Sequence, residues 1–270
     1  MIKMKDYLNI DGTGQATFKV SDTPKIDHLI RERKYDEALS EINQLLKTDH
    51  TSDNLNLKGT ILDKMSEFDK AIAAFDEALE ITRSNEILKN KAEAYYNWAK
   101  VTFFPAEDYE KAITLIDSGI ETLPEGEDAS EYYFLKAEIF EGMNELVEAH
   151  KYYLKAYKEF DKLDEFQKQI DYLKSTNDTL INIVGCDFYN YVPKSGDILS
   201  LIKDEENEHD PDAVAVVIGG DVKGYVANSS YTLIDEVKSA SVIKNMIGDE
   251  QKAEILFVYL GEYVIAKLIK

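Results

Sequence analysis

The sequence is poor in cysteine and in long apolar runs. Its 270 residues include one cysteine, Cys186, which excludes an intramolecular disulfide and a cysteine-cluster metal site. No run approaches the roughly 18 consecutive apolar residues that a membrane span needs. The N-terminal residues also lack the apolar core of a signal peptide. We therefore expect a soluble, cytoplasmic protein that has no membrane partner.

Positive charge is also scarce. The chain carries 31 basic and 52 acidic residues, a formal net charge of -21. The part after residue 177 holds 8 of the basic and 16 of the acidic residues, so the acidity is not confined to one end. A surface this negative repels phosphates at long range, which argues against a protein that coats nucleic-acid backbones. It favours a basic partner instead.

Known catalytic motifs are missing as well. The chain has no phosphate-binding G-x-x-x-x-G-K-[ST] loop and no G-x-S-x-G nucleophile elbow. The four histidines are scattered, and the acidic turn at 205–212 lacks the ligand spacing and central glycine of a calcium loop. Cys186 lies in an apolar stretch and is predicted to be a core residue. We expect no enzymatic activity, no cofactor and no metal.

Four related phrases recur between residues 24 and 160: K-Y-D-E-A-L, E-F-D-K-A-I, D-Y-E-K-A-I and N-E-L-V-E-A-H. Their alanines stand 33, 41 and 37 residues apart, close to the period of about 34 of helical hairpin repeats; they are Ala38, Ala71, Ala112 and Ala149. Small residues are needed where two helices cross closely, and Gly59 lies twelve residues before Ala71 on the preceding helix. The repeats predict helical hairpins.

At these points the chain resembles tetratricopeptide repeats. The resemblance implies an α-α superhelix of about four hairpins over residues 22–177, with 1–21 as an N-terminal arm. The longer spacing before Ala112 predicts an extended helix or a bulging loop at 98–108. Residues 160–176 place apolar side chains on one stripe and are expected to cap the array; they are Leu163, Phe166, Ile170 and Leu173.

The concave face of such an array usually binds a peptide or a partner helix, so an unknown protein is the expected partner. Some family members grip a C-terminal carboxylate with Lys and Asn side chains. The candidates for such a clamp occupy unequal positions in successive repeats; they are Asn54, Asn56, Lys89, Asn90 and Lys91. The alternative is that these are solvated surface residues.

From Leu180 the pattern changes from helical spacing to strands. Strands are expected at 180–189, 197–203, 213–218 and 222–226, with a glycine turn at Gly219 and Gly220. A short helix is expected at 228–237, and a closing hairpin at 252–269. About six strands and one or two helices predict a small closed β barrel over residues 178–270. The predicted fold class is therefore α+β multidomain.

Three motifs stand in order in this barrel: Val184-Gly185 followed by Phe188-Tyr189, then N-E-H-D-P-D-A-V-A-V at 207–216, then Gly224-Tyr225-Val226. Together they resemble a HIRAN domain. The resemblance implies binding of single-stranded DNA at a free 3′ end. By analogy, the rings of Phe188, Tyr189, His209 and Tyr225 would stack on or flank the terminal base, and Asp210 would accept a hydrogen bond from the terminal hydroxyl.

Each of these residues also has a structural interpretation. If Phe188 and Tyr189 adjoin on a strand, they point to opposite faces, and one of them belongs to the core. Asp210, placed before Pro211, commonly caps a turn. Five carboxylates crowd residues 205–212 and the single nearby lysine is Lys203, so an approaching phosphate meets repulsion.

Two functions remain open from the sequence. In the first, the chain is an adaptor whose barrel binds nucleic acid, most simply a single-stranded DNA 3′ end, while the helical array recruits a protein. In the second, it is a protein–protein interaction scaffold with no affinity for nucleic acid. The order of the barrel motifs favours the first and the negative charge favours the second.

Overall fold

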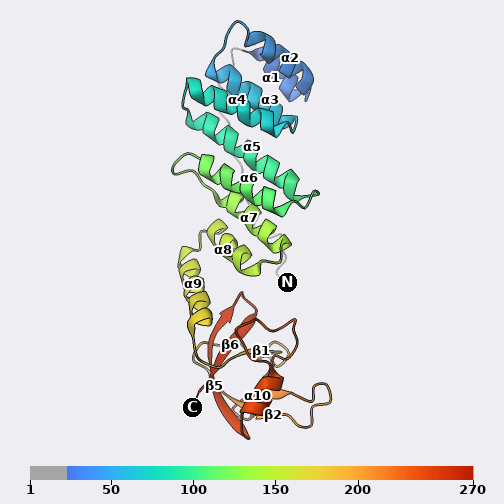
Figure 1. The fold of residues 1–270 in the computed structure, drawn as a ribbon, viewed down its shortest axis with the longest axis vertical. Helices are drawn as coiled ribbons and strands as arrows, with labels where there is room; N and C mark the ends of the chain where they lie inside the picture. The colour runs from blue at the N-terminus through green and yellow to red at the C-terminus, as the bar shows by residue number, and fades with distance from the viewer. Residues whose placement is uncertain (1–22, 270) are drawn as a thin grey trace. The chain divides into compact units, whose positions relative to one another are not determined.

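The computed structural model describes residues 23–269, so the expected N-terminal arm lies outside the described residues. Over that range it contains ten helices and six strands (Figure 1). The chain divides into two compact units, the first ending at Glu127 and the second beginning at Asp128. The change from helix to strand predicted near residue 177 falls between the ninth helix and the first strand.

The first unit consists of helices paired as hairpins. They are α1 (Pro24–Arg31), α2 (Tyr35–Leu45), α3 (Ser52–Lys64), α4 (Phe68–Ile81), α5 (Asn85–Phe103) and α6 (Tyr109–Thr122). Polar residues cap several helix starts, as where Thr51 accepts a hydrogen bond from the Asn54 amide and Asp108 accepts one from the Lys111 amide. Helix α5 has 19 residues, which confirms the extended helix expected before Ala112.

The repeated alanines lie where the helices of a hairpin cross. Ala38, Ala71 and Ala112 are completely buried. Gly59 is buried on α3, and its close neighbour is the ring of Phe75 on α4. A Cβ added to Gly59 would lie 2.6 Å from Cε1 of that ring. The small residues predicted from the repeat therefore do allow close packing, with Gly59 making room for a fully buried aromatic side chain.

The second unit begins with three helices, α7 (Ser130–Gly142), α8 (Leu146–Ala156) and α9 (Phe160–Ser175). Helix α9 exists as predicted, and its apolar stripe is covered by the barrel of the same unit. Phe166, Ile170 and Leu173 join a buried cluster with barrel residues, and the Phe166 ring stacks on Tyr259 with centroids 5.2 Å apart. Burial of this stripe holds α9 against the barrel.

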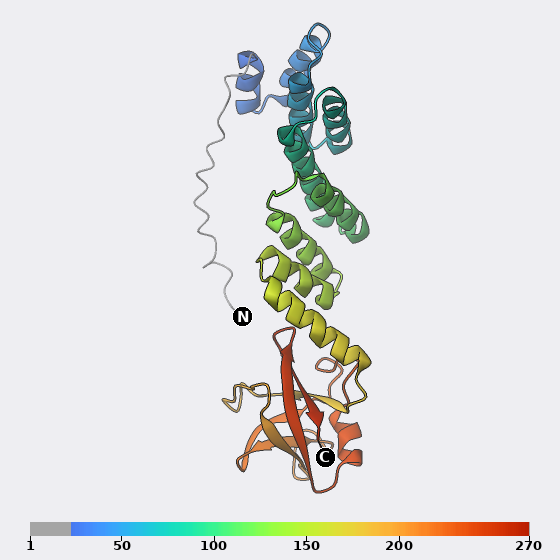
Figure 2. The ribbon, with the colours of Figure 1, turned by 90° about the vertical axis from the view of Figure 1, so that its left-hand side faces the viewer.

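The barrel is closed, with the strand order β1-β4-β3-β2-β5-β6 and antiparallel pairing throughout. Its strands are β1 (Leu180–Val184), β2 (Ile198–Lys203), β3 (Val214–Ile218), β4 (Asp221–Val226), β5 (Glu250–Tyr259) and β6 (Tyr263–Leu268), with α10 at Ala240–Met246 (Figure 2). Gly219 and Gly220 both have positive φ and form the turn between β3 and β4, as predicted.

Strand β1 is buried on both faces, because alternate residues enter different clusters. Ile181 and Ile183 face the barrel core, where Ile243 of α10 also packs. Leu180 faces the cluster that contains α9. This dual burial explains why residues 180–184 form a continuous apolar run apart from Asn182.

The helix predicted at 228–237 is wrong, since these residues form turns and the helix starts at Ala240. Asn228, the first residue of this segment, contacts another element instead, because its Oδ1 accepts a hydrogen bond from the Ser241 amide of α10 at 3.1 Å. Asn182 Nδ2 holds the same segment by donating to the Thr232 carbonyl at 2.7 Å. These tertiary contacts fix the segment as a loop.

Candidate functional site

The predicted barrel residues gather around a cluster of three aromatic rings. The Phe188 and Tyr189 centroids lie 5.0 Å apart at 81°, and the Tyr189 and Tyr225 centroids lie 6.1 Å apart at 49°. Phe188 is 82% exposed, while Tyr189 and Tyr225 are half-buried. Aromatic residues from separate motifs, the turn after β1 and strand β4, therefore meet at one place on the surface.

Phe188 and Tyr189 lie in a turn, so the prediction that both sit on a strand is wrong. Strand β1 ends at Val184, and Gly185 takes a φ of 79°, which a side chain would strain. The Tyr189 amide then donates to the Cys186 carbonyl at 3.1 Å. Since the turn breaks the alternation of a strand, neither ring is forced into the core.

Tyr225 connects this cluster to the acidic loop before β3. Its hydroxyl donates to Asp204 Oδ2 at 2.9 Å, and Asn207 Nδ2 donates to the same oxygen at 3.0 Å. Hydrogen bonds from these two side chains hold the pKa of Asp204 below its usual value. The pKa of Tyr225 is raised, first by burial and then by the Asp204 carboxylate. Sequence reasoning missed Asp204, whose only signal was its place one residue before the glutamates.

Asp210 is engaged within the protein through both carboxylate oxygens. Oδ1 accepts a hydrogen bond from the Asp212 amide at 2.8 Å, and Oδ2 accepts one from Asn228 Nδ2 at 2.9 Å. These contacts confirm the turn-capping interpretation. His209 is exposed, and its backbone amide donates to Asn207 Oδ1 at 3.0 Å. The structure records no ring contact between His209 and the aromatic cluster among residues 23–269.

One cation near this loop, Lys244, is already paired. Lys244 Nζ donates to the Pro211 carbonyl at 2.6 Å and lies 3.4 Å from Glu205 Oε2. Burial raises the pKa of the Cys186 thiol, so this cysteine is an inert core residue. Within the described range no three His, Cys, Asp or Glu side chains converge as a metal site would require. The helices there are too short or too polar to cross a membrane.

The candidate residues for a carboxylate clamp on the helical hairpins bind one another or nearby acidic residues instead. Lys89 Nζ lies 2.6 Å from Glu127 Oε1, and Lys91 Nζ lies 2.5 Å from Asp76 Oδ1. Asn54 is buried and donates to the Asp49 carbonyl at 2.9 Å.

The remaining two candidates belong to a different arrangement, a polar ladder between α3 and α5. In one rung, Asn90 Nδ2 donates to Asn56 Oδ1 at 3.0 Å. In the other, Asn97 Nδ2 lies 3.1 Å from both carboxylate oxygens of Asp63. Each rung joins residues 34 apart in the sequence. This spacing equals the repeat period of about 34 residues and could have indicated the pairing from the sequence.

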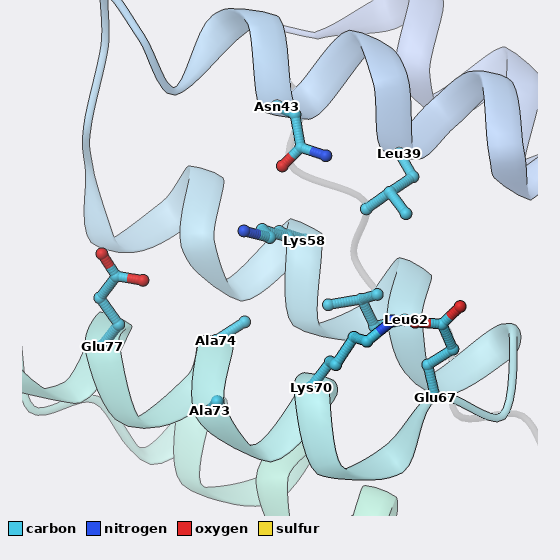
Figure 3. Close-up of a pocket in the computed structure, with 9 residues that line it drawn as sticks. All are labelled: Leu39, Asn43, Lys58, Leu62, Glu67, Lys70, Ala73, Ala74 and Glu77. Carbon is cyan, nitrogen blue, oxygen red and sulfur yellow. Dashed lines mark hydrogen bonds and ion pairs between the residues drawn. The ribbon is translucent and has the colours of Figure 1, made fainter.

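A shallow cavity of about 440 Å³ lies between α2 and α4, with α3 as its floor (Figure 3). Leu39 and Leu62 give it apolar patches. Its charged residues balance, because Lys58 and Lys70 face Glu67 and Glu77, and Lys70 is paired with Glu67. This cavity therefore does not select a ligand of either charge.

No family model matches the chain, and no curated protein matches it. Among solved structures that match is the crystal structure of MamA, with 19% sequence identity and a TM-score of 0.36, covering 52% of this chain and 77% of that one. The helical hairpins and the closed barrel are observed directly, whereas the likeness of the barrel to a HIRAN domain stays a prediction.

Proposed function

We propose that the chain is a protein–protein interaction scaffold whose helical hairpins bind an extended segment of a partner protein. The observation that carries this proposal is the polar ladder of α3 and α5. Its two rungs contain three half-buried amide side chains and the buried carboxylate of Asp63. An amide group has two N–H donors and a carbonyl with two lone pairs, so one bond to its neighbour leaves capacity for a peptide backbone.

The arrangement suits a backbone ligand more than a single charged group. Asn56 and Asp63 lie seven residues apart on α3, and Asn90 and Asn97 lie seven apart on α5, so the rungs are two helical turns from each other. Two rungs at this separation, about 10 Å along the helix, can contact peptide groups about three residues apart in an extended chain, which rises about 3.3–3.6 Å per residue.

The test is affinity capture from an extract of the source organism, with quantification of the bound proteins. The variant Asn90→Ala with Asn97→Ala should lose the specific partner, whereas Asn43→Ala, an exposed amide on α2, should retain it. Unfolding followed by Trp98 fluorescence must show that all variants remain folded. If the double variant captures the same proteins in the same amounts as the unaltered chain, the ladder is not the binding surface.

A second candidate, the adaptor with a barrel that binds nucleic-acid ends, is favoured by one observation, the exposed aromatic cluster. Base stacking on an aromatic ring contributes about 1–3 kcal/mol, and Phe188 presents an open face for it. Fluorescence anisotropy with short single strands tests this function by comparing a 3′ hydroxyl with a 3′ phosphate. Preference for the hydroxyl that disappears in Phe188→Ala supports the adaptor, and equal, negligible binding of both strands rejects it.

A further inference from the structure

A second groove, of about 590 Å³, lies wholly within the second unit. It is bordered by the start of α8, the later half of α9, the loop at 234–236 and the turn between β5 and β6. The volume is within the range of about 300–1,000 Å³ that is typical of ligand-binding clefts.

The floor of the groove is apolar. Ile170, Leu173 and Tyr259 form its buried base, and Leu146 at the rim is 40% exposed. An apolar floor under an exposed leucine favours an occupant that brings apolar side chains of its own.

The rim of the groove is acidic. Glu145, Asp235 and Glu236 stand there with one cation, Lys174, while a fourth carboxylate, Glu148, is paired with Lys151 at 2.8 Å. The side chains of Asp235 and Glu236 are exposed and make no hydrogen bond or ion pair with another residue of the described range. Burial and the Glu236 carboxylate together raise the pKa of Tyr259 to about 12, which places this negative charge beside the apolar floor.

The turn between β5 and β6 provides an independent observation. The Glu262 amide donates to the Tyr259 carbonyl at 3.1 Å, and both central residues have positive φ, 53° at Leu260 and 77° at Gly261. Asn-Gly is the pair that such a turn prefers, because leucine is strained at positive φ. The side chain at this strained position, Leu260, lines the groove.

Leu260 also packs against the buried cluster that joins α9 to the barrel, so its side chain belongs both to that cluster and to the wall of the groove. Asparagine at position 260 would relieve the backbone but would remove an apolar wall of the groove.

We infer that this groove binds a basic amphipathic segment of a partner protein, one that inserts large apolar side chains and places Lys or Arg against the acidic rim. The inference rests on the proposed scaffold function, to which it adds a second binding surface and the chemistry of its ligand. Complementary charge selects and orients such a segment, while burial of its apolar side chains supplies the affinity.

The test uses the full chain and three fluorescent peptides of equal length in fluorescence anisotropy at about 0.15 M salt, where long-range attraction is screened. One peptide carries leucines at helical spacing among lysines, the second replaces each leucine with serine, and the third replaces each lysine with glutamate. Only the Leu/Lys peptide should bind, about tenfold or more tighter than either of the others.

Variants of the protein locate the binding. Asp235→Lys with Glu236→Lys should weaken binding of the Leu/Lys peptide by about tenfold or more, because both carboxylates of the rim are reversed. The matched control, Asp164→Lys with Glu165→Lys, makes the same change in net charge at exposed residues of α9 outside the groove and should weaken it by less than about threefold. Leu260→Asn should weaken binding while the unfolding midpoint is retained.

Three results would overturn the inference: equal binding of the Leu/Lys and Ser/Lys peptides, equal losses from the two charge reversals, or no binding at all. The ladder variant Asn90→Ala with Asn97→Ala should leave peptide affinity unchanged. If the Leu/Lys peptide fails these tests while the ladder variant still loses the captured partner, only this inference is rejected, and the scaffold function stands.

Discussion

Replacement of Gly59 by alanine has two effects of opposite sign on the free energy of unfolding. In a helix interior alanine is more favourable than glycine by about 0.8–1.0 kcal/mol. The new Cβ, however, would lie 2.6, 2.7 and 2.8 Å from three ring atoms of Phe75. That ring is completely buried, so it cannot swing into solvent.

Overpacking of a filled core costs about 1–3 kcal/mol. The cost should be near the upper end here, because three atoms of an enclosed ring are displaced together. After subtraction of the propensity gain, we expect Gly59→Ala to lower the free energy of unfolding by about 1–2 kcal/mol.

Chemical unfolding can be followed in the first unit by fluorescence, because Trp98 is the single tryptophan of the chain and stacks on Phe68 at 6.1 Å. Ala73→Gly, at an exposed position of α4, measures the propensity effect alone and should cost about 1 kcal/mol. In a Phe75→Leu background the clash should shrink, with a coupling energy of about 0.5–3 kcal/mol. An increase in stability from Gly59→Ala in the unaltered chain would refute the reasoning.

Three further predictions concern the second unit. Burial lowers the pKa of His150 in the folded state, so below about pH 6.5 the unfolded state binds a proton more readily than the folded state. The free energy of unfolding should therefore decrease as the pH is lowered. Denaturation at several pH values should show this decrease, and His150→Gln should reduce it. Gly224→Ala should lower the thermal midpoint of the barrel, because the new Cβ would lie 2.8 Å from the Val184 carbonyl oxygen, a backbone atom that cannot move aside; an unchanged midpoint would contradict this. Tyr225→Phe removes the hydrogen bond to Asp204 and should lower the free energy of unfolding in urea by about 1 kcal/mol. An unchanged free energy of unfolding would show that this hydrogen bond does not stabilise the barrel.

Local elements with strong periodic signals could be predicted from the amino-acid pattern. The alanines of the four phrases marked helix crossings, and all of them are buried. The glycine pair at Gly219 and Gly220 marked a hairpin turn, because only glycine takes positive φ there without strain. The apolar stripe of residues 160–176 marked a helix with one buried face. Each of these signals depends on neighbours within a few residues, so a linear pattern is enough to show it.

The packing of those elements, and the side chains that it brings together, depends on the three-dimensional fold. Asn228 could cap a helix of its own, yet it caps α10 because the Ser241 amide reaches it across the fold. Asp204 and Tyr225 stand 21 residues apart and are joined by a side-chain hydrogen bond, because β2, which precedes Asp204, and β4, which contains Tyr225, both pair with β3. Likewise, the rungs of the polar ladder and the acidic groove are assembled from separate elements. Such sites depend on contacts between residues far apart in the sequence. A local pattern cannot specify these partners, because the packing of the apolar faces of all elements together sets which segments become neighbours.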